Sequence, residues 1–488
     1  LARIRSTPIA ELAAAGDVEV SIAEVDAVTA ALWARYRGEV AADPARIAAR
    51  TAQTLTLGDA VMRYHEQTIG PRPAGGYPLY IALHGGGGAP PALNDDQWQQ
   101  MQVYYRDSVD AGVYVAPRGI SDTWDLHFRP SSYALYDRLI EDALVFADVD
   151  PDRVYLLGYS AGGDGVYQLA PRLTSRLAAA SMSAGHPNGV ALDNLYHLPF
   201  AVTVGERDDA YDRNRVDAEY CGRLSALARA HPDGYAGACF VHLGGPHNVP
   251  DNDPRPRTHE VLADPAAWLA RGDRTPRAVD TNAIRWLREH RRVRHPTTLR
   301  WNLAVRAPAE RLASAVAGDV ALLPPAHTFA WLAIEDDAPT VGVVEARLDR
   351  DANAVVLIGA PPTLRLRLAP DMLDLDRELR VVIDGDELRV TARPRLATLA
   401  ETLLERGETT LEMGLDRVPG DPHRVGDVID PELFVVPQDQ RGPLTMRERS
   451  QCLDQLRLVL TELDLVLGGR ALVVDREVVT ERHQAAPV

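Results

Sequence analysis

The sequence predicts an α/β fold, with a mostly parallel sheet flanked by helices and a separate β-rich domain after it. Three observations lead to this prediction. From residue 78 onward, short apolar runs alternate with segments of helical spacing, which is typical of parallel strands joined by right-handed crossover helices. After residue 295, the helical segments give way to short β-like runs. Finally, 488 residues with a hydrophobic content of 46% suffice for more than one globular domain.

The first segment, residues 1–52, is predicted to be helical. The stretches 22–37 and 44–54 are rich in Ala, Arg and Glu, and their apolar residues recur at three- and four-residue spacing. We expect these helices to form a packing arm or a lid. Residues 54–64 follow, with a turn signal at Gly58-Asp59, and they are predicted to form a hairpin.

The domain from residue 53 to 295 is predicted to carry the parallel sheet. Its buried strands are expected at 78–83, 112–116, 153–157, 178–184, 199–204 and 238–243. Its helices are expected at 132–148, 161–173, 212–230, 259–270 and 277–291, the last two closing the domain. In such a sheet the carboxyl ends of the parallel strands meet at one edge, and functional loops gather there.

Residues 296–415 are predicted to form an all-β, sandwich-like domain. Its strands are expected at 299–305, 328–335, 341–348, 354–359, 364–368, 379–383 and 387–392. The dipeptide Asp384-Gly385 between the last two indicates a tight hairpin turn. A helix is expected to follow at 396–406.

The remainder of the chain is predicted to be a linker and a tail. Residues 416–442 are rich in Pro, Asp and Gly, which is typical of a linker. The tail, 443–488, is expected to contain an amphipathic helix at 446–467 and a β-like run at 471–474. The leucine stripe of this helix is expected to pack on its own chain or on a second copy, so the chain is a candidate homo-oligomer.

The most informative motif is Gly158-Tyr-Ser160-Ala-Gly162, which lies between a strand-like run and a helix-like segment. This order of elements is the nucleophile elbow, a sharp turn that lifts a serine hydroxyl above the edge of a sheet. The two glycines are needed because side chains there would collide with the neighbouring strand and helix. The motif therefore predicts that Ser160 is a nucleophile.

A serine nucleophile needs a base, and the base needs an acid that orients it. Asp208 lies three residues beyond the end of a predicted strand, and it is favoured as the acid over Asp209, which stays open. His247 follows the next strand in a glycine-rich loop and is favoured as the base over His242 and His231. The alternative for each is an ordinary surface or structural role.

A third element is the run His84-Gly-Gly-Gly-Gly88, which follows the strand 78–83. Glycines let backbone N–H groups approach a developing negative charge, so this loop predicts an oxyanion hole. Gly85 and Gly86 are the expected donors from this loop, and Ala161 is the expected donor after the nucleophile. A phosphate loop would require a Gly-Lys-Ser/Thr sequence, which is absent here.

Two further loops follow strands at the same predicted edge. Trp124 and His127 lie in the loop after 112–116, and His186 lies in the loop after 178–184. These three residues are candidates to line an acyl or alcohol site, and the alternative is that Trp124 is packing and the histidines are satisfied loop residues. Asp164 lies in the first turn of the helix after the elbow, where a carboxylate complements the helix dipole, and is interpreted as structural.

Charge and cysteine content restrict the partners and the compartment. A net charge of −17 is unfavourable for nucleic acid and for anionic membranes. No apolar run approaches the ~20 residues that a membrane span requires. The three cysteines, Cys221, Cys239 and Cys452, are widely spaced and predict neither a disulfide framework nor a zinc site. These observations favour a cytoplasmic location. A secreted location stays open because no signal is visible but the chain begins at Leu1.

Together these residues resemble the α/β-hydrolase superfamily. The segment 84–247 is similar to the bacterial esterase, polyhydroxybutyrate-depolymerase-like and prolyl-oligopeptidase-like group, and the run 373–385 is similar to a β domain that trails some members. The resemblance covers about 55–410 and is specific for fold and nucleophile. It implies an acyl-enzyme on Ser160 that is hydrolysed by water activated by His247, with no metal and no organic cofactor.

The leading functional hypothesis is a serine hydrolase that cleaves small carboxylic esters. Three alternatives stay open. A serine peptidase would use the same triad, and an aminopeptidase would need acidic groups such as Glu206, Asp209 or Asp122 to hold the substrate ammonium. An acyltransferase would favour an alcohol over water as acceptor. The non-enzymatic alternative is a binding or assembly protein on a hydrolase fold.

Overall fold

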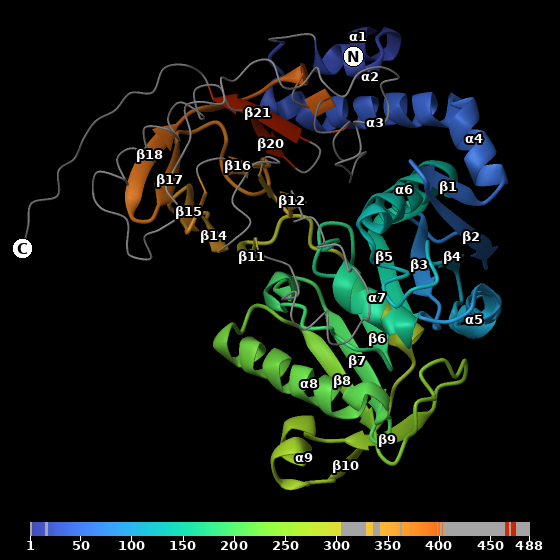
Figure 1. The fold of residues 1–488 in the computed structure, drawn as a ribbon. Helices are drawn as coiled ribbons and strands as arrows, with labels where there is room; N and C mark the ends of the chain where they lie inside the picture. The colour runs from blue at the N-terminus through green and yellow to red at the C-terminus, as the bar shows by residue number, and fades with distance from the viewer. Residues whose placement is uncertain are drawn as a thin grey trace, which may run out of the picture.

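The computed structural model describes most of the chain and is drawn in Figure 1. The described residues are 2–14, 18–303, 328–334, 342–361, 364–397, 399–400, 403, 464–467 and 470–474.

Within these residues the dominant element is a ten-stranded sheet with the order β1-β2-β4-β3-β5-β6-β7-β8-β9-β10. The strands β3 to β8 are parallel to one another, whereas β1, β2, β9 and β10 pair antiparallel at the two sides. The bounds are β1 (Thr54–Leu57), β2 (Ala60–Ile69), β3 (Tyr77–Leu83), β4 (Gly112–Pro117), β5 (Val149–Tyr159), β6 (Ala179–Ser183), β7 (Phe200–Gly205), β8 (Gly237–His242), β9 (Thr258–Leu262) and β10 (Pro276–Asp280).

Helices cover both faces of this sheet. One face packs against α6 (Pro130–Phe146), α7 (Ala161–Leu169) and α8 (Arg213–Ala230), and the other packs against α5 (Pro91–Tyr104) and α10 (Ala283–Leu287). Side chains of β5 alternate between the two cores, because Leu156 faces the first and Leu157 faces the second. The predicted mostly parallel sheet flanked by helices is therefore confirmed, and it has the architecture that the resemblance implies (Figure 1).

Two predicted helices of this domain were wrong. Residues 259–270 form β9 followed by the short helix α9 (Pro265–Arg271), and residues 277–291 contain β10 and α10. The local reason is capping: the Asp264 side chain accepts the Ala267 N–H and Pro265 occupies the first helical position. The Asn282 side chain likewise accepts the Arg285 N–H. Helix α5 was not among the predicted elements.

The N-terminal segment is helical, as predicted, and it packs away from the elbow. It consists of α1 (Ala2–Ser6), α2 (Ile9–Ala13), η1 (Ile22–Glu24), α3 (Val25–Ala42) and α4 (Pro44–Thr51). Its apolar side chains form one core with Val145 of α6 and with Leu396, Leu399 and Leu403. The buried Arg46 forms ion pairs with Glu141 and Asp142 of α6. These helices are thus a packing arm between α6 and the C-terminal region.

A second β region follows the α/β domain. Its five-stranded sheet, order β11-β14-β15-β17-β18, and its three-stranded sheet, order β12-β13-β16, share one apolar core in the described residues. Trp301 of the first sheet stacks on Phe329 of the second, with ring centroids 5.6 Å apart. The bounds are β11 (Thr298–Asn302), β12 (Thr328–Phe329), β13 (Leu332–Ala333), β14 (Val343–Asp349), β15 (Ala354–Ile358), β16 (Arg365–Leu366), β17 (Leu379–Ile383) and β18 (Asp386–Val390).

The predicted hairpin turn at Asp384-Gly385 joins β17 to β18, and both residues have positive φ. A further sheet has three strands, in which β21 (Arg470–Val474) lies in the middle. It pairs with β19 (Ala392–Pro394) on one side and with β20 (Asp464–Leu467) on the other. The predicted helix at 446–467 was therefore wrong at 464–467. The rest of that helix, its leucine stripe and the linker at 416–442 lie outside the described residues.

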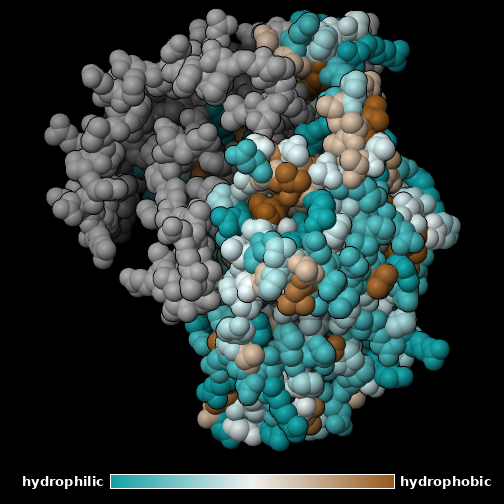
Figure 2. All heavy atoms as spheres, turned by 45° about the vertical axis from the view of Figure 1, so that its right-hand side comes forward, coloured by the Kyte–Doolittle hydropathy of each residue, from teal (hydrophilic) through white to brown (hydrophobic). Residues whose placement is uncertain are grey.

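The surface of the α/β domain is mostly hydrophilic on the face drawn in Figure 2, where apolar residues occur in small separate groups. This pattern agrees with the net charge of −17. Across the part of the chain that the structure describes, no helix has the length and apolar content to span a bilayer.

A disulfide joins Cys221 of α8 to Cys239 of β8, with 6.0 Å between the Cα atoms. The widely spaced cysteines predicted no disulfide framework, and this single pair was not predicted. Helix α8 packs directly against β8 and brings together two thiols that are 18 residues apart in the sequence. Cys452 lies outside the described residues.

Replacing both Cys221 and Cys239 with Ala is expected to lower the free energy of unfolding by about 3 kcal/mol, because the closed loop restricts the unfolded chain. Calorimetry of the double variant beside Cys452→Ala measures this effect, and the control variant should unfold like the wild type. Denatured, unreduced wild type should expose one free thiol per chain. Three free thiols would contradict the disulfide.

Candidate active site

Ser160 occupies the sharp turn between β5 and α7. Its backbone angles, φ 57° and ψ −122°, lie in a region that L-residues rarely adopt. A Cβ on Gly158 would approach the Gly162 carbonyl oxygen to 2.3 Å, and a Cβ on Gly162 would approach the Leu83 carbonyl oxygen to 2.1 Å. Both glycines of the motif are therefore required by close backbone contacts, and the turn presents Ser160 at the carboxyl edge of the sheet.

His247 lies between Ser160 and Asp208. Its Nε2 is 3.1 Å from Ser160 Oγ, and its Nδ1 is 2.7 Å from Asp208 Oδ2. Because the carboxylate can only accept, Nδ1 carries the proton and Nε2 is left to accept the serine hydroxyl proton. The three residues come from the ends of β5, β7 and β8, so sheet topology brings together residues that are distant in sequence.

The two neighbouring aspartates differ in their surroundings. Asp208 is 2% exposed and contacts the histidine, whereas Asp209 is exposed and its side chain makes no contact with His247. Asp208 also lies 3.9 Å from the buried Arg213 guanidinium. A Cβ on Gly205 would meet the Pro246 carbonyl oxygen at 2.0 Å, so this glycine lets the acid loop and the histidine loop touch.

The glycine loop after β3 lies against Ser160. A Cβ on Gly85 would sit 3.2 Å from the Ser160 Cβ. The N–H of Gly87 is already donated to Asn94 Oδ1 at 2.8 Å, whereas the N–H groups of Gly85 and Gly86 make no hydrogen bond within the described residues. Ala161 is the first residue of α7, where N–H groups have no intrahelical acceptor. Gly85, Gly86 and Ala161 thus retain donors beside Ser160.

Two buried histidines, His84 and His127, hold the backbone of this loop through hydrogen bonds. His84 Nε2 accepts the Gly119 N–H at 3.0 Å, so its Nδ1 carries the proton and donates to the Gly85 carbonyl. His127 donates from Nε2 to the His84 carbonyl and accepts from the Tyr136 hydroxyl, each at 2.9 Å. Burial lowers the pKa of His84 to about 3 and the pKa of His127 well below its usual value. Both rings are therefore neutral.

His127 is fully buried. The expectation that it lines a substrate site is replaced by the alternative, a satisfied structural histidine. Its position under the loop fixes the His84 carbonyl and with it the backbone of the glycine run.

Trp124 contacts the glycine loop that follows β3. A Cβ on Gly88 would come within 2.5 Å of the indole nitrogen, so the ring packs directly on the loop. The indole also meets Tyr211 edge to face, with centroids 5.2 Å apart. Tyr211 is 61% exposed, has φ 60°, and carries the buried Arg213 guanidinium on its ring at 4.8 Å. The sequence analysis missed Tyr211, and the available signal was an aromatic residue three positions after the acid.

His186 lies in the loop after β6, at the same edge, and is partly buried. Its backbone N–H donates to Asp164 at 2.7 Å, and its Nδ1 accepts the Asn188 N–H at 3.0 Å. Burial lowers the pKa of the His186 ring and raises the pKa of Asp164 to about 6. Asp164 therefore ties the first turn of α7 to the β6 loop, which agrees with its structural interpretation.

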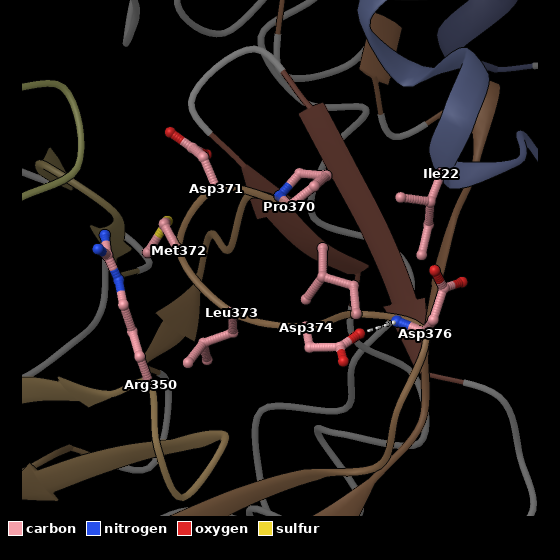
Figure 3. Close-up of a pocket in the computed structure, with 9 residues that line it drawn as sticks. Ile22, Arg350, Pro370, Asp371, Met372, Leu373, Asp374 and Asp376 are labelled. Atoms are coloured by element: carbon pink, nitrogen blue, oxygen red, sulfur yellow. Dashed lines mark hydrogen bonds between the residues drawn. The ribbon is translucent and has the colours of Figure 1, made fainter.

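A cavity of about 360 Å³ lies elsewhere, between the N-terminal segment and the second β region. Figure 3 shows its lining of Ile22, Arg350 and the turn 370–376, in which Asp374 accepts the Asp376 N–H at 3.2 Å. None of its lining residues comes from the loops around Ser160. Among the residues that the structure describes, no group of three or more His, Cys, Asp or Glu side chains is placed to bind a metal ion.

Comparisons with known proteins give the following similarities. No protein-family model matches the chain. A stretch of 145 residues is 26% identical to the bifunctional acetylxylan esterase/xylanase XynS20E of Neocallimastix patriciarum, covering 29% of this chain and 20% of that protein. The chain thus matches about a fifth of the length of this curated relative.

Among solved structures, similar chains include esterases and a depolymerase. A thermostable esterase is 19% identical, with 49% of this chain and 62% of that chain covered and a TM-score of 0.34. Esterase PE8 is 21% identical, with 38% and 92% covered and a TM-score of 0.28. LpqC, a poly(3-hydroxybutyrate) depolymerase from Bordetella parapertussis, is 17% identical, with 39% and 80% covered and a TM-score of 0.31.

The raised pKa of Asp164 makes a pH-dependent contribution to stability. An unfolded aspartate titrates near 3.9, so between about pH 4 and pH 6 only the unfolded chain gives up this proton. Stability from this group is therefore present at low pH and is lost as the pH rises to 6.

The Asp164→Asn variant lacks this titration. Its free energy of unfolding, relative to the wild type, should rise by about 2 kcal/mol between pH 4 and pH 7. Calorimetry of both proteins across this range measures the difference. A difference that is the same at every pH would show that Asp164 is not a buried carboxyl with a raised pKa.

Proposed function

We propose that the protein is a serine hydrolase that cleaves carboxylic esters through an acyl-enzyme on Ser160. The observation that carries this proposal is the hydrogen-bonded series Ser160–His247–Asp208 at the carboxyl edge of the sheet. The donors of Gly85, Gly86 and Ala161 beside the serine complete the constellation.

The reaction proceeds in two halves. In the first, His247 Nε2 takes the proton of Ser160 Oγ as the oxygen attacks the ester carbonyl carbon, and the carbonyl oxygen becomes an oxyanion held by backbone N–H groups. His247 then gives this proton to the departing alkoxide, leaving the acylated serine. In the second half, His247 takes a proton from water, the hydroxide attacks the acyl carbon, and the proton returns to Ser160 as the acid leaves.

Asp208 acts through the histidine. Its carboxylate holds the Nδ1–H tautomer and stabilises the imidazolium that forms in each half-reaction. The low exposure of Asp208 strengthens this interaction, because little water screens it. Each step is balanced by proton transfer between Ser160, His247, the leaving alcohol and water, so the proposed mechanism uses no metal and no organic cofactor.

Two of the three carboxylates that an aminopeptidase could use are already paired, whereas Asp209 is exposed. An aminopeptidase needs a free carboxylate for the substrate ammonium, but Glu206 is held by Arg274 and by the Gly244 N–H, each at 2.6 Å. Asp122 is paired with Arg118 and accepts from Asn94. The curated relative with local similarity is named as an esterase/xylanase, which is consistent with ester substrates.

We propose that the rings of Trp124 and Tyr211 form a wall that contacts the organic part of the ester. We place His186 beneath this wall, at the same edge of the sheet. Trp124 packs on the glycine loop and Tyr211 follows the acid loop, so the pair connects two loops that flank the serine. The exposed ring of Tyr211 is the part available to a small-molecule ester.

The compartment proposed from the disulfide differs from the cytoplasmic location that the sequence favoured. A stable disulfide forms in oxidising environments and is rare in a reducing cytosol. We therefore propose that the Cys221–Cys239 pair forms in an oxidising compartment.

Assembly through the tail at 443–488 stays a proposal, tested by the solution mass of the chain with and without that segment.

Substitutions in the triad test the function. Hydrolysis of p-nitrophenyl butyrate should be abolished in Ser160→Ala and should fall by about 10⁴-fold in kcat in Asp208→Asn, since the wrong histidine tautomer is then favoured. Asp209→Asn is the matched control and should retain wild-type turnover. Equal losses in the two Asn variants, or undiminished hydrolysis by Ser160→Ala, would contradict the proposal.

The aromatic wall is tested with Tyr211→Ala. Loss of one aromatic contact should raise KM for p-nitrophenyl butyrate by about fivefold, in proportion to ~1 kcal/mol of aromatic packing, while kcat changes little. Tyr235→Phe, which alters a tyrosine away from the serine, serves as the control. An unchanged KM in Tyr211→Ala would remove Tyr211 from the substrate site.

A further inference from the structure

We propose that Tyr159, the residue immediately before the nucleophile, is a positioning residue that sets the distance between His247 and Ser160. This inference rests on the proposed function, because it assigns the part that holds the base in place. It is carried by the contacts of the Tyr159 side chain with the main chain of the histidine loop.

The Tyr159 hydroxyl makes two hydrogen bonds to this loop. It donates to the His247 carbonyl and accepts the Val249 N–H at 3.2 Å. Its ring also lies edge-on to the imidazole of His247, with centroids 5.7 Å apart. The Tyr159 side chain thus contacts the His247 carbonyl, the His247 ring and the N–H of Val249.

The loop that carries His247 is irregular, and its nearest main-chain bond to another segment, from the Arg207 N–H to the Gly245 carbonyl at 2.8 Å, lies two residues before the base. Residues 243–257 contain no helix or strand, and the His247 side chain is 39% exposed. Asp208 orients the ring through Nδ1, but a hydrogen bond at the tip of a side chain does not fix the backbone that carries it. The Tyr159 hydroxyl supplies this constraint directly at the His247 carbonyl.

A second anchor holds the far end of the same loop. Asp251 is fully buried and accepts from the Tyr105 hydroxyl at 2.7 Å, from the Tyr104 hydroxyl at 3.2 Å and from Ser183 Oγ. The Ser183 carbonyl in turn accepts the N–H of Ser160 at 2.9 Å. The loop that carries the base is therefore tied at His247 to β5 and at Asp251 to β6, which pairs with β5 in the sheet.

The location of Tyr159 explains why this matters for the reaction. Because Tyr159 is the last residue of β5 and Ser160 follows it, the strand that presents the nucleophile also holds the base. A displacement of about 1 Å between reacting groups can lower a rate by about 10²-fold. Loss of the hydroxyl should therefore slow proton transfer from Ser160 without altering how substrate binds.

The test compares Tyr159→Phe with Tyr155→Phe. Tyr155 lies on the same strand and its hydroxyl donates to the His290 carbonyl at 2.7 Å, so the control removes the same kind of bond at a distance from the serine. For p-nitrophenyl butyrate, Tyr159→Phe should lower kcat by roughly tenfold to a hundredfold with KM unchanged. The rate of inactivation by a fluorophosphonate should fall by a similar factor. Tyr155→Phe should match the wild type in both measurements.

The outcomes separate the inference from the function it rests on. A Tyr159→Phe enzyme with the wild-type kcat and inactivation rate would overturn the inference while the serine mechanism stands. Equal losses in both variants, in step with equal losses of melting temperature, would also overturn it, because the hydroxyl would then be merely structural. A wild type that the fluorophosphonate does not label would contradict the proposed function itself.

Discussion

The strained backbone of Ser160, held between β5 and α7, is the constraint on which the rest of the candidate site depends. A backbone of this kind costs of order 1–3 kcal/mol and persists only where its surroundings enforce it. The enforcement is visible on both sides of the turn. Strand β5 is paired with β3 and with β6, and every residue of α7 is buried. The turn cannot relax without separating a central strand from its neighbours, so the serine stays at the edge of the sheet.

The remaining parts of the site are arranged around this fixed point by buried polar groups with complete partners. His84 and His127 are neutral and hydrogen-bonded through both ring nitrogens, so they shape the glycine loop and do not compete as bases. Asp164 and Asp251 bind the loops after β6 and β8 to the core in the same manner. His247 differs, since its ring is partly exposed and lies between a buried carboxylate and a hydroxyl. The contrast agrees with a structural role for the first set of groups and with the proton-transfer role proposed for His247.

Much of the fold was predictable because the central strands are buried on both faces and read as apolar runs. The juxtaposition of Ser160, Asp208 and His247 was also predictable, since each follows a parallel strand and such strand ends share one edge. The elements at the edge of the sheet were not predictable. The segment 258–271 has apolar residues at a spacing that suits either a strand or a helix, and the helix cap at Asp264 determines where α9 begins. The burial of His127, the Cys221–Cys239 disulfide and the Trp124–Tyr211 contact depend on tertiary packing between distant segments, which local patterns do not contain.

In the proposed mechanism, Ser160 carries the acyl group during turnover. This step is tested by mixing the enzyme with p-nitrophenyl acetate, stopping the reaction with acid before the steady state, and locating the acetyl group by peptide mass spectrometry. We expect one acetyl group per chain on the peptide that contains Ser160, and none in the Ser160→Ala variant. Acetylation at another residue with turnover intact, or rapid hydrolysis with no acetylated peptide at any time, would contradict it.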